Sequence, residues 1–233
     1  MPKRDNNSMR LCGMCQVRAS LNTSEAGERD LEARYEHIRR SVDVARAGAE
    51  LAKVDNAGFQ ELLALLDDLD VTVGADAVFS ESWARAQPRF GLTLVLPGRR
   101  PLIWLNLFKH MSVAALVDTV VHEAIHATVS ILRRYPRTPQ PNEEIAYHGE
   151  ELVALTSANH ILTKINFPAQ QEVTINIMAI EAQKVTLRQL GCAEPFMHAR
   201  AAEGEAAAAL LTDHLIKVDV PTLAEIRAHR SDK

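Results

Sequence analysis

Residues 112–134 read SVAALVDTVVHEAIHATVSILRR, and this stretch decides how the rest of the chain is interpreted. It contains neither glycine nor proline, and its apolar residues recur at helical spacing, so it predicts a largely buried helix. Ser112 is a suitable N-cap, and Pro136 follows the predicted end of the helix. The centre of the stretch is His122-Glu123-Ala124-Ile125-His126, an H-E-x-x-H sequence.

The two histidines of this sequence are candidate metal ligands. Residues four positions apart on a helix share a face, with side-chain roots about 5–6 Å apart, so His122 and His126 can both reach one Zn²⁺ at about 2.0–2.1 Å. Glu123 projects beside such an ion, where it can take a proton from a water molecule. The alternative is two histidines satisfied by ordinary hydrogen bonds. A metal ion is favoured because polar groups inside so apolar a helix are costly to bury without a partner.

A catalytic zinc ion usually takes three protein ligands, and the third is sought in PQPNEEIAYHGEELVALTSANHIL, residues 139–162. A short proline-rich connection predicts that the chain returns as an antiparallel helix with Asn142 as its N-cap. At 1.5 Å per residue, a ligand about nine residues beyond that cap is level with the histidines. The helix rise therefore favours Glu151, with Glu150 and Glu144 as open alternatives.

The whole chain is expected to have three parts: a flexible leader over 1–23, an N-terminal helical region over 24–69, and one domain over 70–233. The predicted fold class is α+β, in which a small antiparallel sheet is followed by a mostly helical domain that carries the metal site on an antiparallel helix pair. The strand over 102–106 is expected at the sheet edge, where an extended substrate could add as a further strand. The predicted elements are strands over 71–73, 90–96 and 101–106 and helices over 24–54, 58–69, 112–134, 142–164, 169–190, 195–216 and after Pro221.

Composition narrows the classes of protein to consider. The 233 residues carry a formal net charge of −4, which gives no overall basic surplus for nucleic-acid binding. Three cysteines argue against a disulfide-built scaffold, and the Cys12–Cys15 pair lacks the second pair of a zinc ribbon. No signal peptide or membrane span is recognisable, so we expect a cytoplasmic protein with no membrane partner.

The quoted motifs carry a family resemblance. HEAIHA at 122–127, followed by AYHGEELVALTSANHIL at 146–162, resembles the zincin-type metallopeptidase segment of ArdC-like antirestriction proteins. More loosely it is similar to the gluzincins and the ImmA/IrrE peptidases. The resemblance covers about residues 118–160, and Leu155 stands where the ArdC-like pattern has an acid. It implies a zincin-like α+β fold in which His122, His126 and Glu151 bind one Zn²⁺ and Glu123 is the general base.

Motif and resemblance together predict a zinc metallopeptidase, a hydrolase that cleaves peptide or protein substrates. The alternative is a non-hydrolytic, zinc-bound regulatory or antirestriction-type protein that interacts with DNA or with a DNA-processing enzyme. The basic pairs Arg39–Arg40 and Arg99–Arg100 are the places where such a protein would contact phosphates.

Overall fold

The computed structural model describes residues 33, 35, 36, 38–40, 42–76, 90–94, 99–110, 112–132 and 143–215. The predicted leader with Cys12 and Cys15, the predicted N-cap Asn142 and the helix predicted after Pro221 lie outside these residues. In chain order the elements are β1 (Val42–Asp43), α3 (Val44–Leu51), α4 (Ala57–Asp68), β2 (Thr72–Asp76), β3 (Gly91–Leu94), β4 (Leu102–Leu105), α6 (Val113–Leu132), α7 (Glu143–Lys164), α8 (Gln170–Gln189) and α9 (Glu194–Leu215).

The four described strands form a mixed sheet in the order β1-β2-β4-β3. The expectation of an antiparallel sheet is corrected here, because β2 and β4 pair in parallel while the other two pairs are antiparallel. The expected edge position of residues 102–106 is also wrong. β4 lies inside the sheet, between β2 and β3, and all four of its residues are buried. Its continuous apolar sequence, Leu-Ile-Trp-Leu, is typical of a strand covered on both faces.

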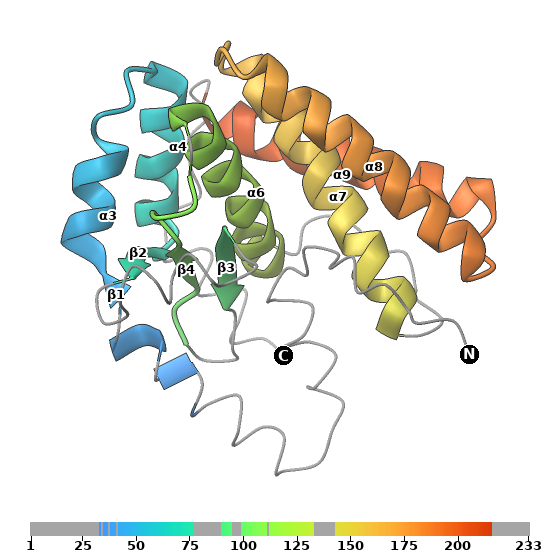
Figure 1. Cartoon of the computed structure of the whole chain (residues 1–233), viewed down its shortest axis with the longest axis horizontal. Helices are drawn as coiled ribbons and strands as arrows, with labels where there is room; N and C mark the ends of the chain where they lie inside the picture. The colour runs from blue at the N-terminus through green and yellow to red at the C-terminus, as the bar shows by residue number, and fades with distance from the viewer. Residues whose placement is uncertain are drawn as a thin grey trace.

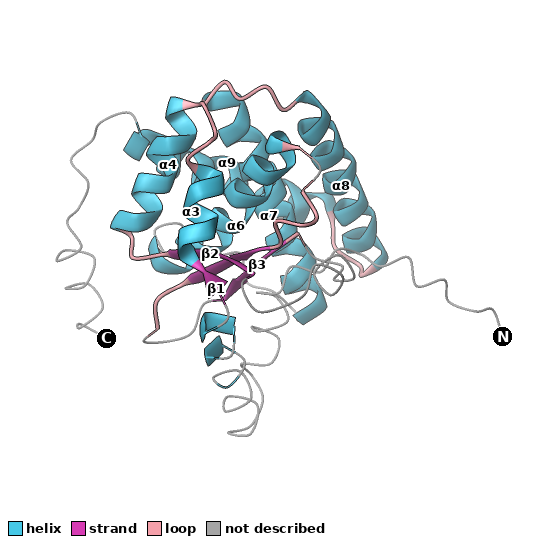
Figure 2. Ribbon diagram, turned by 60° about the vertical axis from the view of Figure 1, so that its left-hand side comes forward, coloured by secondary structure: helices cyan, strands magenta, loops and turns pink. Residues whose placement is uncertain are grey.

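The two faces of the sheet belong to different hydrophobic clusters. Ile103 and Leu105 of β4 pack in the main core against the helices, whereas Leu102 and Trp104 point the other way. On that second face they join Leu92, Leu94 and Tyr35. Figure 2 shows the long helices gathered above one face of the sheet and a short helical piece below the other. The alternation of side chains along a strand therefore separates the core into two parts.

Helix α6 lies between the sheet and the α7–α9 group, as Figure 1 shows in green against yellow and red. It begins as predicted, because the hydroxyl of Ser112 accepts a hydrogen bond of 3.0 Å from the amide of Ala115. Buried residues from several helices, from β4 and from the turn before β2 make up one cluster around it, which includes Phe59, Leu66, Val71, Ile103, Val117, Val121, Ala154, Ile161 and Leu211. None of the helices described here has both the length and the apolar character that crossing a membrane requires.

The predicted helix over 24–54 is interrupted in the part that the structure describes. Strand β1 occupies Val42 and Asp43 and pairs with Ala75 and Asp76 at the end of β2. Asp43 then caps α3 by accepting a hydrogen bond of 2.8 Å from the amide of Arg46. The cap and the strand pairing together overcome a helical periodicity that continues through this segment.

Three helices end in the same backbone geometry, which was not predicted from the sequence. Asp70, Asn166 and Gly191 follow α4, α7 and α8 with positive φ angles of 61°, 50° and 85°. After each, an amide bonds back to a carbonyl five residues earlier, as in Val71 to Leu66. These Schellman ends satisfy the last carbonyls of each helix and turn the chain sharply.

Candidate metal centre

Helices α6 and α7 bring three potential metal ligands together. The Nε2 atoms of His122 and His126 lie 3.2 Å apart. The carboxylate of Glu151 approaches both rings, with Oε2 3.6 Å from Nε2 of His122 and Oε1 3.4 Å from Nε2 of His126. Among the described residues, these three form the group whose histidine, cysteine or carboxylate donor atoms all lie within 4.8 Å of one another.

The spacing of these atoms suits a small divalent ion. Four donors placed tetrahedrally around Zn²⁺ at 2.0–2.1 Å stand about 3.3 Å from one another. The two histidine nitrogens are 3.2 Å apart, and each lies 3.4–3.6 Å from a different oxygen of Glu151, so these distances are close to that value. Two imidazole nitrogens and one carboxylate oxygen are also a donor set that zinc and other first-row divalent ions accept. The residues therefore fit a metal ion, and three protein donors leave a fourth position open.

Burial sets the protonation state of the first histidine. The pKa of His122 is lowered to about 4, mainly by removal from water and to a smaller extent by the nearby His126 ring. The Glu151 carboxylate acts in the opposite direction but does not outweigh burial. A histidine with this pKa is neutral at pH 7, which is the form that binds a metal ion. The side chains of His126 and Glu151 are 3% and 5% exposed, and that of His122 is 16% exposed. The group is therefore most accessible from the His122 side.

Glu123, the predicted general base, is itself held by the sheet. It is buried on α6, and its Oε2 accepts a hydrogen bond of 2.6 Å from the hydroxyl of Thr93 on β3. Thr93 is completely buried. Gly91, two residues earlier on the same face of β3, has no side chain to displace the carboxylate. A Cβ atom there would lie 2.9 Å from Cγ and 3.1 Å from Oε1 of Glu123.

Sequence reasoning missed Thr93 and Gly91. The available signal was weak, since it consisted of a glycine and a threonine two positions apart in the otherwise apolar run FGLTLVL. Gly91 and Thr93 are brought next to Glu123 only because β3 packs against α6.

The two alternative acids and the nearby His148 lie outside the three-residue group. Glu144 is exposed and Glu150 is partly exposed, and neither belongs to the three-residue group. His148 is buried, and its Nδ1 lies 2.6 Å from Oε1 of Gln183 on α8. Its ring packs edge-on against the ring of Tyr147. The contacts of His148 therefore join α7 to α8.

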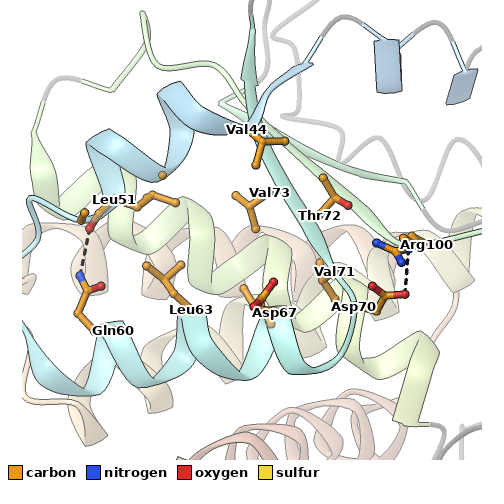
Figure 3. A pocket seen from close by; sticks show the side chains of 13 residues that line it. Val44, Leu51, Gln60, Leu63, Asp67, Asp70, Val71, Thr72, Val73 and Arg100 are labelled. Carbon is orange, nitrogen blue, oxygen red and sulfur yellow. Dashed lines mark hydrogen bonds and ion pairs between the residues drawn. The ribbon is translucent and has the colours of Figure 1, made fainter. Parts of the chain in front are cut away.

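A pocket of about 300 Å³ lies between α3, α4 and β2, away from this group. Figure 3 shows its apolar wall of Leu51, Leu63 and Val73, with Gln60 bonded to Leu51 at one end and the Asp70–Arg100 ion pair at the other. It shares no residue with the candidate metal centre.

No protein-family model matches the chain, and neither the curated proteins nor the solved structures yield a significant match. The candidate function therefore depends on the residues and their geometry.

Proposed function

We propose that the protein is a zinc-dependent metallopeptidase of the zincin type that hydrolyses peptide bonds. The observation that supports this most directly is the group of His122, His126 and Glu151, whose donor atoms lie within 4.8 Å of one another. Glu123 is the second support, because it is adjacent in sequence to a ligand candidate and is buried against β3. The ArdC-like and gluzincin-like resemblance of the same residues agrees with this proposal.

Each residue has a defined role in this proposal. His122, His126 and Glu151 would hold one Zn²⁺, which when bound supplies Lewis-acid polarisation of the scissile carbonyl and of a water molecule. Glu123 accepts a proton from the attacking water and later donates it to the leaving nitrogen. A substrate would approach from the His122 side, where the group is most exposed.

The test combines metal analysis with hydrolysis. Purified wild type is expected to contain about one zinc ion per chain and to cleave a mixture of quenched fluorescent peptides. Glu123→Gln should keep the zinc and lose activity by about 100-fold or more, because the amide cannot take the proton. Zinc-loaded wild type that cleaves none of the peptides would contradict the proposal. Full activity in metal-loaded Glu123→Gln would show that Glu123 is not the general base.

A second candidate, contact with DNA by a non-hydrolytic protein, is favoured by one specific observation. The two basic pairs predicted from the sequence share a surface. Arg39, Arg40 and Arg99 all approach the Glu36 carboxylate, at 3.0, 3.9 and 3.7 Å. The hydroxyl of Tyr35 donates to the carbonyl oxygen of Arg100 and so fixes the two segments to each other.

This surface has a net positive charge. The four arginine side chains are 48–78% exposed, and Glu36 and Asp70 are the acids paired with them. The hydrogen bond from Arg39, helped by the charges of the three arginines, keeps the pKa of Glu36 below its usual value. A phosphate backbone could therefore meet a local positive charge even though the whole chain is acidic.

Fluorescence anisotropy with single-stranded DNA over a salt series tests this second candidate. Binding through the four arginines should weaken steeply with salt, and Arg39→Ala/Arg40→Ala should reduce the logarithmic slope by about 0.7 for each phosphate that the variant no longer neutralises. Lys184→Ala/Arg188→Ala on α8 removes the same charge elsewhere and serves as the control. Wild type without salt-dependent binding would eliminate this candidate.

A further inference from the structure

We propose that Thr93 is a positioning residue that fixes the carboxylate of Glu123, an inference that rests on the proposed peptidase function. The Thr93 hydroxyl lies 2.6 Å from Oε2 and 3.0 Å from the backbone carbonyl oxygen of Glu123. A threonine hydroxyl has one proton to donate, and an ionised carboxylate is a stronger acceptor than a carbonyl already used in a helix. The shorter distance agrees with donation to Oε2.

The need for such a residue follows from the flexibility of glutamate. The last torsion angle of its side chain is broad, so an unheld carboxylate rotates over a wide range. A general base works only when its oxygen stays within reach of the proton it takes. One strong hydrogen bond to one oxygen stops that rotation and leaves the orientation of the carboxylate defined.

Thr93 can do this because its own position is fixed. Its β-branched side chain has few rotamers, and it is completely buried. Its backbone is in register with Ile103 of β4, which in turn pairs with β2 inside the sheet. The hydroxyl is thus presented from a rigid strand rather than from a loop.

Gly91 provides the space that the Glu123 carboxylate occupies beside β3. It lies on the same strand face, and an added Cβ would clash with Cγ of Glu123 at 2.9 Å and crowd its Oε1 at 3.1 Å. Strand β3 therefore defines the position of the Glu123 carboxylate: Gly91 leaves space for it, and the Thr93 hydroxyl hydrogen-bonds to it. Neither residue is ionisable, so neither competes with Glu123 for the transferred proton.

Two substitutions at position 93 separate the hydroxyl from the shape of the side chain. Thr93→Val is nearly isosteric and lacks the hydroxyl, whereas Thr93→Ser keeps it. On the zinc-loaded full chain with quenched fluorescent peptides, we expect Thr93→Val to lower kcat by about 10–100-fold with KM and zinc content unchanged. Thr93→Ser should stay within about threefold of wild type. Thr212→Val, a buried threonine on α9 bonded to its own helix, is the matched control.

A stability cycle gives a readout that needs no substrate. The free energy of unfolding is measured by urea for Thr93→Val, Glu123→Ala and the double variant, with and without a chelator. If Thr93 holds Glu123, the double variant loses less than the sum of the two single variants. Thr93→Ala replaces Thr93→Val in both experiments if the valine variant does not fold.

The outcomes distinguish this inference from the proposed function. Additive losses in the cycle, or wild-type kcat in zinc-loaded Thr93→Val, overturn the role of Thr93 while leaving the peptidase proposal in place. Wild type that binds zinc and cleaves nothing overturns the peptidase proposal, and with it the role of Thr93 in positioning a general base. Coupling in the cycle together with a fall in kcat that serine rescues supports the inference.

Discussion

Oε1 of Glu151 lies 3.4 Å from Nε2 of His126, so a carboxylate on α7 faces an imidazole on α6. Both side chains are almost completely inaccessible to water. An acid and a base buried this close need either a shared proton or a shared cation to offset the cost of their desolvation. The second histidine, His122, also faces the same carboxylate, which favours a cation between all three.

Replacement of Glu151 tests which acid is the third ligand. Glu151→Gln keeps the size of the side chain and removes its charge. We expect zinc affinity to fall by more than about 100-fold, since loss of even an outer hydrogen-bond partner of a ligand costs about 10–100-fold. Competition with a chromophoric chelator measures the change. Glu150→Gln and Glu144→Gln are the controls and should bind zinc like wild type; a larger loss in either would make that residue the ligand instead.

Gly91→Ala should disturb Glu123 without removing the metal. The new methyl group would come within 2.9 Å of Cγ of Glu123 and 2.8 Å of Cγ2 of Thr119, so one of them must move. We expect kcat to fall by about 10-fold or more with zinc content retained. Gly74→Ala is the control, because it creates a similar clash at 2.7 Å with Val42 elsewhere in the sheet. If both variants lose equal activity, general strain in the sheet is the cause rather than displacement of the base.

Gly204 lies where α9 packs closely against α7. A Cβ atom there would lie 2.8 Å from the carbonyl oxygen of Val153, and the hydroxyl of Ser157 donates to the carbonyl oxygen of Gly204 at 2.7 Å. Gly204→Ala should therefore lower the free energy of unfolding by about 1–3 kcal/mol.

The control for that substitution is Gly48→Ala in α3. Open space surrounds the new methyl group at this position. Because alanine has a higher helix propensity than glycine, this substitution should raise the free energy of unfolding by about 0.5–1 kcal/mol. Urea unfolding measures both changes, and stabilisation by Gly204→Ala would show that α7 and α9 can separate without cost.

The stability of the protein should fall in mild acid partly through His110. Burial lowers the pKa of His110 to about 4, and the backbone of Asn106 only partly compensates. Between about pH 6.5 and pH 4 the unfolded chain therefore binds a proton at this residue that the folded chain does not. The free energy of unfolding should decrease by up to about 3 kcal/mol as pH falls through that window and stay constant above it.

The comparison of wild type with His110→Phe isolates this contribution from those of the other histidines. The variant should lose less stability than wild type between pH 7 and pH 4, as measured by urea unfolding. His198→Gln, which replaces an exposed histidine on α9, is the control. An identical pH profile for wild type and His110→Phe would contradict the prediction.

The positions of helix α6 and of strands β3 and β4 were predictable because they follow from local signals. The apolar period of 112–134 and the Ser112 cap are set by neighbouring residues, and α6 begins where they indicate. The parallel pairing of β2 with β4 was not predictable in this way. It depends on which strand lies beside the apolar run of β4, and no local signal in either strand specifies its neighbour.

The sequence by itself determined that His122 and His126 share one helix face, because the pitch of a helix fixes that from spacing alone. Helix rise also favoured Glu151 as the third candidate ligand, with Glu150 and Glu144 left open. Only the tertiary structure decided that Glu151 reaches both rings and that Thr93 reaches Glu123. Those contacts depend on how α7 and β3 pack against α6, and packing is set by side chains from the whole core.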